Sequence, residues 1–72
     1  MENKIKQIIH KINEQVDIET INHNSHLKND LGLDSLNLAM LTVEIEDEFD
    51  IDIFENGIVN TFGEIMEILN TQ

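Results

Sequence analysis

The start of a helix can be recognised in DLGLDSLNLAML, residues 30–41. This stretch passes from a loop-like segment with one glycine into an apolar run that repeats with helical spacing. Asp34 and Ser35 stand at the junction, and both are residue types that commonly cap a helix N-terminus. We therefore predict a helix that starts at Asp34 or Ser35 and ends near Phe49. Ser35 is then a lone hydroxyl at a helix start, and its purpose has to be explained.

The predicted helix carries two apolar lines, although a helix in a bundle usually buries one stripe. The line expected to face the core consists of Leu38, Leu41, Ile45 and Phe49. The other line is rotated away from it and consists of Leu36, Ala39, Met40 and Val43. Either the bundle covers both lines, or the second is an exposed apolar strip rimmed by carboxylates, which is typical of a docking surface.

The remaining segments also read as helices and loops. Apolar residues at 5, 8, 9, 12 and 16 predict a first helix over residues 3–16. Residues 17–34 break this pattern and predict a long ordered loop pinned by its leucines and isoleucines. TFGE at 61–64 has the form of a capping box, which predicts the start of a last helix. Asp50, Asp52, Asn56 and Gly57 leave room for one short helical turn around residues 55–59.

The expected fold is all-α: a small four-helix bundle of three main helices and a short third helix, of a single turn or irregular form, with a long loop between helices 1 and 2. The chain of 72 residues has no proline, internal repeat or low-complexity linker, so we expect a single domain over residues 1–72.

Composition narrows the function. Residues 29–72 hold eleven acids and no lysine or arginine, which argues against nucleic acid and favours basic protein partners, although the acids could serve solubility alone. The absence of cysteine means that any thiol chemistry must be borrowed, and it fits a reducing cytoplasmic location. The N-terminal sequence lacks the apolar run of a signal peptide or a membrane anchor, so no stable membrane insertion is expected.

No metal site is predicted either. DEFDIDIFENG, residues 47–57, does not have EF-hand spacing, and His23 and His26 are expected to be exposed to solvent. His10 is expected at the edge of the first helix.

Ser35 is a poor candidate for a catalytic nucleophile. GLDSL is not the Gly-x-Ser-x-Gly elbow of hydrolases, and the histidines are distant in sequence. No catalytic residue, and no enzyme activity of its own, is therefore predicted. Two interpretations remain: a plain helix cap shared with Asp34, or a serine modified by another protein. In the second case free backbone N–H groups at the helix start would stabilise an attached phosphate.

The motif DLGLDSL, residues 30–36, resembles the prosthetic-group attachment motif of acyl carrier proteins. The surrounding sequence HLKNDLGLDSLNLAMLTVEIEDEFDIDI, residues 26–53, resembles the loop end and second helix of that family, and NTFGEIMEIL resembles its last helix. The resemblance implies that a holo-acyl-carrier synthase, a phosphopantetheinyl transferase, attaches 4′-phosphopantetheine from coenzyme A to Ser35. The arm would supply the missing thiol and carry acyl groups as thioesters.

The resemblance also implies a docking surface on a monomeric carrier. Asp34 and Leu36 flank the attachment serine. The residues expected to face basic patches on the synthase and on acyl-processing enzymes are Asp34, Leu36, Ala39, Met40, Val43, Glu46 and Asp47. In this family the bundle interior can shelter an acyl chain, which here would involve Leu41, Ile45, Phe49, Ile53 and Ile65.

Departures from the family pattern leave the pathway open. Asn37 and Met40 stand where many fatty-acid carriers have acids, and FENGIVN, residues 54–60, is short with one acid. Fatty-acid, polyketide and other specialised acyl metabolism all remain. Two alternatives are an aminoacyl or peptidyl carrier of non-ribosomal synthesis, in which a Gly-Gly-His/Asp-Ser pattern is more common, and an unmodified acidic adaptor protein.

Overall fold

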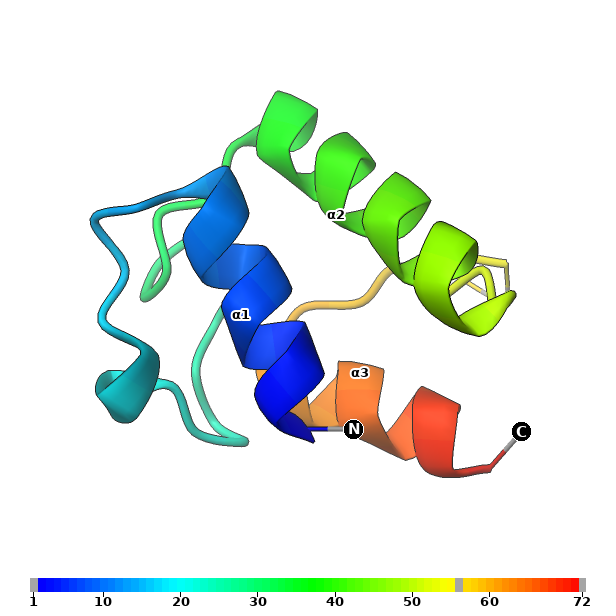
Figure 1. Ribbon diagram of the computed structural model, residues 1–72. Coiled ribbons are helices and arrows are strands. Elements are labelled where there is room, and N and C mark those ends of the chain that lie inside the picture. The colour runs from blue at the N-terminus through cyan, green and yellow to red at the C-terminus, as the bar shows by residue number, and fades with distance from the viewer. Residues whose placement is uncertain (1, 56, 72) are drawn as a thin grey trace.

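The computed structural model describes residues 2–55 and 57–71 and is all-helical there, which confirms the predicted fold class. The main helices are α1 (Glu2–Ile12), α2 (Ser35–Phe49) and α3 (Phe62–Asn70), and a 3₁₀ turn, η1 (Ile18–Thr20), lies between the first two. Figure 1 shows α2 across the top of the view and α3 across the bottom, with α1 running from one toward the other. The N-terminal end of α2 therefore lies at the end of the molecule away from α3.

The helices α1 and α2 run antiparallel and are joined by two ion pairs. Lys4 Nζ lies 3.1 Å from Glu48 Oε1 and Lys11 Nζ lies 3.4 Å from Glu44 Oε2, so the start of α1 faces the end of α2. These side chains are half exposed, so each pair contributes little to stability. Apolar packing is what holds the helices together.

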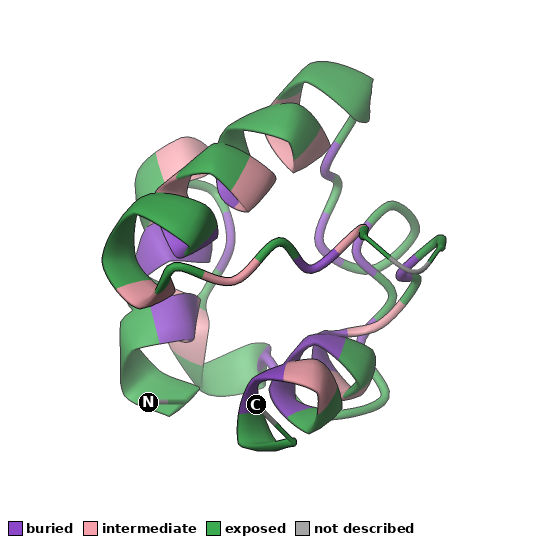
Figure 2. Ribbon diagram, turned by 90° about the vertical axis from the view of Figure 1, so that its right-hand side faces the viewer, coloured by how far each residue is buried: buried purple, intermediate pink, exposed green. Residues whose placement is uncertain are grey.

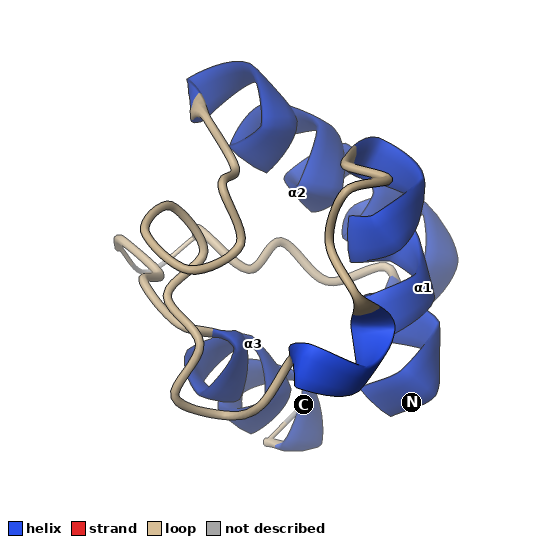
Figure 3. Ribbon diagram, turned by 90° about the vertical axis from the view of Figure 1, so that its left-hand side faces the viewer, coloured by secondary structure: helices blue, strands red, loops and turns tan. Residues whose placement is uncertain are grey.

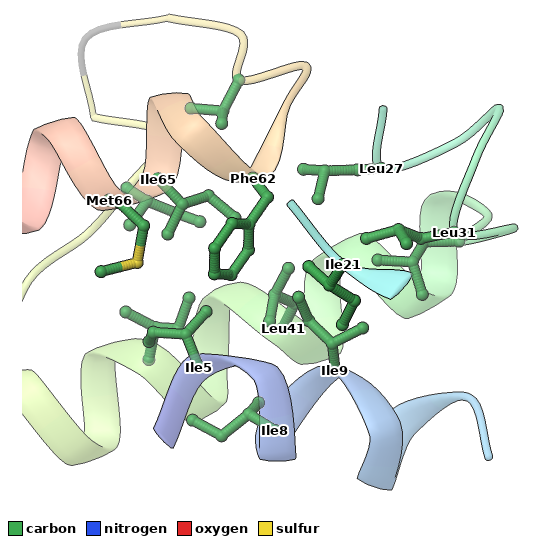
Figure 4. Packing of buried hydrophobic residues seen from close by; sticks show 14 of the residues in the cluster. Ile5, Ile8, Ile9, Ile21, Leu27, Leu31, Leu41, Phe62, Ile65 and Met66 are labelled. Carbon is green, nitrogen blue, oxygen red and sulfur yellow. The ribbon is translucent and has the colours of Figure 1, made fainter. Parts of the chain in front are cut away.

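The core is built from the predicted helical stripes and from the loops between them (Figure 4). Phe62 is its largest fully buried side chain, and its ring points from α3 into the cluster. The buried apolar residues are Ile5, Ile8, Ile9, Val16, Ile21, Leu27, Leu31, Leu33, Leu41, Ile45, Ile53, Val59, Phe62, Ile65, Met66 and Leu69. The predicted core line of α2 is confirmed, since Leu41 and Ile45 are buried and Leu38 and Phe49 pack against the cluster.

The segment between α1 and α2 is the long ordered loop that the sequence predicts (Figure 3). Leu27, Leu31 and Leu33 are each at most 4% exposed and anchor it in the core. The Leu27 N–H donates to the Asn60 carbonyl at 2.8 Å, and the Leu33 N–H donates to the Leu27 carbonyl at 2.9 Å. The loop is thus fixed both to the segment before α3 and to itself.

Two predictions about helix limits are wrong. The first helix ends at Ile12 instead of residue 16, because the Asn13 side chain accepts a hydrogen bond from the Gln15 N–H and competes with the helical backbone. The short third helix around residues 55–59 is not formed in the described part of that segment: residues 53–55 form a turn and residues 58–60 have no regular structure. Gly57 has a φ of 136°, which no right-handed helix allows, and Asn56 lies outside the described residues. The bundle therefore has three α-helices among its described residues.

The capping box predicted at the start of α3 is confirmed. Thr61 Oγ1 accepts from the Glu64 N–H at 3.2 Å, and Glu64 Oε1 accepts from the N–H groups of Asn60 and Thr61 at 3.0 and 2.9 Å. Gly63, between Thr61 and Glu64, packs directly on the loop: a Cβ at this position would lie 2.6 Å from the His23 carbonyl oxygen. A residue without a side chain is therefore required where α3 meets the loop.

Acid is expected to weaken the start of α3. Hydrogen bonds from the Asn60 and Thr61 N–H groups hold the pKa of the Glu64 carboxyl below its ordinary value. Since the pKa in the folded state is lower than in the unfolded chain, the stabilisation is complete above the unfolded value of about 4.5 and is lost as the pH falls through the lower folded value. Melting temperatures of wild type and Glu64→Gln should therefore differ at pH 7 and converge toward pH 3.

The matched control for this prediction is Glu67→Gln, which removes a charge from the same helix without touching the hydrogen bonds of the capping box. The difference in melting temperature between Glu67→Gln and wild type should change less with pH. A Glu64→Gln difference that stays constant over the same pH range would contradict the assigned role of the carboxylate.

Candidate functional site

Ser35 is the first residue of α2, and it is exposed. The preceding residue, Asp34, is the N-cap: its Oδ1 accepts from the Asn37 N–H at 2.8 Å, and Asn37 Oδ1 accepts from the Asp34 N–H at 3.3 Å. This reciprocal pair completes the cap without the serine. The interpretation of Ser35 as a plain helix cap is therefore wrong, and among the residues that the structure describes its hydroxyl is free for another use.

The surroundings of Ser35 favour an attached anion. The N–H groups of Ser35 and Leu36 precede the first backbone bond of the helix, in which the Leu38 N–H donates to the Asp34 carbonyl at 2.9 Å. Such unpaired N–H groups and the positive end of the helix dipole stabilise phosphate oxygens. The chemistry of this end of α2 thus fits a phosphodiester on the Ser35 oxygen.

The chain leaves the core immediately before the serine. Leu31 and Leu33 are buried, whereas residues 34–36 are exposed. Gly32, between the two leucines, has a φ of 66°, a left-handed conformation that costs a residue with a side chain roughly 1–2 kcal/mol. The tight turn at Gly32 allows both leucines to reach the core and still delivers Ser35 to the surface.

The second apolar line of α2 is exposed (Figure 2). Leu36 is 69% exposed, Met40 43% and Val43 64%, and Ala39 is exposed as well. The interpretation in which the bundle covers both lines is therefore wrong. We call Leu36, Ala39, Met40 and Val43 the apolar strip.

The acids of α2 fall into two groups. Glu44 and Glu48 face α1 and pair with its lysines. Glu46 and Asp47 are exposed and lie with Val43 around a shallow surface hollow, and within the described residues neither takes part in an ion pair. Negative charge that is not balanced by an ion pair in the described residues thus borders the C-terminal end of the apolar strip.

The hydrogen bonds of the histidines are made with residues outside this site. His10 Nδ1 lies 2.8 Å from the Val16 carbonyl oxygen, and His23 Nε2 lies 3.1 Å from Glu2 Oε1. His23 and His26 are exposed, as predicted. Within residues 2–55 and 57–71, no group of three or more His, Cys, Asp or Glu side chains is arranged to hold a metal ion. None of the helices described there is long and apolar enough to cross a membrane.

One residue near the site was not recognised from the sequence. Asn13 Nδ2 donates to the Leu31 carbonyl oxygen at 3.1 Å and thereby reaches the loop that leads to Ser35. The partners are 18 positions apart, and an asparagine after a helix is ordinarily explained by local capping. No spacing in the sequence signals such a contact.

Comparison with known families agrees with this geometry. The family model described as "phosphopantetheine attachment site" matches residues 3–69, nearly the whole chain. The chain belongs to that family. It is therefore a carrier protein, and 4′-phosphopantetheine is its covalent prosthetic group, as the sequence resemblance predicted. Members of the family are non-catalytic; a phosphopantetheinyl transferase modifies them, and they work with partner enzymes.

The residues present fit this group. It needs one accessible hydroxyl, and Ser35 offers one at the positive end of a helix, with its cap already supplied by Asp34. When bound, the group supplies a terminal thiol on a flexible arm, which this cysteine-free chain lacks.

Proposed function

We propose that Ser35 carries the 4′-phosphopantetheine and that the protein is an acyl carrier protein, which presents acyl groups as thioesters to a series of separate enzymes. The observation that carries the proposal is the exposed Ser35 hydroxyl in the first turn of α2, released from capping by Asp34. The whole chain would act as one carrier domain, a monomer in the cytoplasm.

The apolar strip and its acids are the proposed docking surface. Asp34 and Leu36 flank the attachment point, and Ala39, Met40, Val43, Glu46 and Asp47 continue the surface along α2. Its partners would be the phosphopantetheinyl transferase and acyl-processing enzymes with basic patches. Attraction between opposite charges gives fast association that weakens with salt, which suits a carrier that must leave each enzyme quickly.

The sequence around Ser35 favours an acyl cargo over an aminoacyl one. It reads Gly-Leu-Asp-Ser, like acyl carriers, instead of the Gly-Gly-His/Asp-Ser more common in non-ribosomal synthesis. Asn37 and the half-exposed Met40 make the first part of the docking helix less acidic than in many fatty-acid carriers. We therefore propose specialised acyl metabolism, such as polyketide synthesis, before housekeeping fatty-acid synthesis.

Intact-mass spectrometry tests the proposal. Purified protein incubated with coenzyme A, magnesium and a phosphopantetheinyl transferase should gain the mass of one phosphopantetheine group and one free thiol. Incubation of that product with acyl and with aminoacyl donors and their loading enzymes then separates the two kinds of carrier. An unmodified adaptor would gain no mass at all.

Val43→Glu should weaken docking more than it weakens the fold. Val43 is 64% exposed in the middle of the apolar strip, so the change costs little packing, and glutamate forms helix at least as well as valine. Burying the new carboxylate against a partner should raise the transferase KM by about fivefold or more, the factor that corresponds to about 1 kcal/mol of binding. The free energy of unfolding should change by only about 0.5 kcal/mol.

The matched control is Ile58→Glu, the same kind of change at a side chain that is 82% exposed and does not belong to α2. It should leave the transferase KM close to that of wild type. An equal rise in KM for both variants would point to net charge as the cause, and a large drop in melting temperature for Val43→Glu would place that side chain in the core.

A further inference from the structure

Asn13, just beyond the end of α1, has a hydrogen-bond partner for its backbone N–H, its carbonyl and both side-chain polar atoms, and one of these bonds joins it to the loop before Ser35. Its backbone N–H donates to the Ile9 carbonyl at 2.9 Å, and its carbonyl accepts from the Val16 N–H at 3.1 Å. Its side-chain Oδ1 accepts from the Gln15 N–H at 3.3 Å, and its Nδ2 donates to the Leu31 carbonyl at 3.1 Å.

The two side-chain bonds fix which way the Asn13 amide faces. A backbone N–H can only donate, so the atom facing Gln15 must be the amide oxygen, and a carbonyl can only accept, so the atom facing Leu31 must be the amide nitrogen. The amide thus bridges a donor on one segment and an acceptor on another. Aspartate has the same shape as asparagine but could satisfy only the first of these two partners.

The bond to Leu31 lies at the tightest point of the loop. Burial of the Leu31 and Leu33 side chains holds them in the core, but apolar contacts are not directional and do not fix the orientation of the backbone between them. The Asn13 hydrogen bond orients the peptide group between Leu31 and Gly32, directly before the residue whose φ is 66°. A Cβ at Gly32 would lie 3.5 Å from Asn13 Nδ2, so the amide also packs against this turn.

Within residues 27–34, the side chains of Asp30 and Asp34 bond only residues close to this segment, His26 and Asn37. Among the described residues, the one side-chain hydrogen bond that joins residues 27–34 to a segment distant in sequence comes from Asn13. Residues 27–34 end at Asp34, the N-cap of α2, and Ser35 is the next residue. We infer that Asn13 is a positioning residue for the attachment serine: its amide holds the Gly32 turn in the one conformation that presents Ser35 to the transferase. The inference rests on the proposed attachment at Ser35.

Asn13→Asp tests the inference with little change in side-chain shape. Without the amide donor, the Leu31 and Leu33 N–H groups, bonded to the His26 and Leu27 carbonyls, should exchange with solvent about fivefold faster, the factor expected for one ordinary hydrogen bond. The transferase KM for the apo-protein should also rise, with kcat unchanged, by the factor by which the fraction of molecules that present Ser35 correctly falls. Asn13→Ala, which adds no charge, should act in the same direction.

The matched control is Asn29→Asp, which adds the same charge on the same loop, beside the same surface hollow. It should change neither the exchange rates nor the KM by more than about twofold, within the usual range for a surface substitution. The Gly63 N–H is bonded to the His23 carbonyl at the start of α3. We expect it to exchange through a local opening that leaves the Asn13–Leu31 bond intact, so its exchange should stay as in wild type in all variants.

Three results would overturn the inference: exchange at Leu31 and Leu33 as slow in Asn13→Asp as in wild type, an equal acceleration at Gly63, or an equal rise in KM for Asn29→Asp. Failure of the proposed function gives a different result: either wild type is not loaded at all, or Ser35→Ala is still loaded, whatever the exchange rates of the loop show.

Discussion

Ser35→Ala is expected to abolish attachment of 4′-phosphopantetheine completely and to leave the helices folded. The phosphodiester needs the serine oxygen, and alanine has none to offer. The cap of α2 is made by Asp34 and Asn37, so the start of the helix survives the change. The free energy of unfolding should therefore stay within about 0.5 kcal/mol of wild type, as for most surface substitutions. Intact-mass spectrometry after incubation with the transferase and circular dichroism measure the two effects.

The other serine of the chain provides the control. Ser25 is 6% exposed, and its Oγ accepts from the Asn22 N–H at 3.0 Å. Ser25→Ala should lower stability by about 1–3 kcal/mol, because it leaves a partly buried donor without its partner, and folded protein should still be loaded. If Ser35→Ala gained the full mass of the prosthetic group, the attachment site would have been assigned to the wrong residue.

Local signals in the sequence account for the parts of the site that were predicted correctly. Asp34 is a residue type that commonly caps a helix, and it stands directly before the apolar run, so the start of α2 could be found from the residues alone. The same holds for Thr61 and Glu64 at the start of α3. The exposure of the apolar strip could not be decided in this way, since it depends on how far α1 and the loops wrap around α2.

The features that the sequence did not reveal depend on contacts between distant residues. Asn13 meets Leu31 only after the loop has folded back on α1, and Gly63 meets His23 only after α3 has docked on that loop. The absence of the short helix has a different cause. Gly57 takes a backbone conformation that glycine alone adopts easily, and this conformation cannot be read from the helix propensities of the segment. Helix periodicity thus predicted the core line of α2, and tertiary contacts decided how the loop presents Ser35.

Phe62→Ala is expected to have the largest effect on stability. Phe62 is fully buried at the start of α3, where its ring meets the edge of the His23 ring at 5.8 Å between centroids and lies 5.9 Å from Lys6 Nζ. It therefore links α3, the long loop and α1 (Figure 4). Truncating a buried phenylalanine to alanine costs about 3–5 kcal/mol, and a domain of this size is stable by only about 5 kcal/mol or little more.

We therefore expect Phe62→Ala to be partly unfolded at room temperature, with a urea midpoint far below that of wild type and reduced helical signal in circular dichroism. Ile58→Ala removes an aliphatic side chain that is 82% exposed and should change stability by at most about 0.5 kcal/mol. We expect the transferase to act on Ser35 only at the start of a formed α2, so the initial loading rate of Phe62→Ala should fall in proportion to its folded fraction. A wild-type urea midpoint for this variant would contradict the central place of Phe62 in the core, and undiminished loading of unfolded chain would mean that the transferase reads the local sequence without the fold.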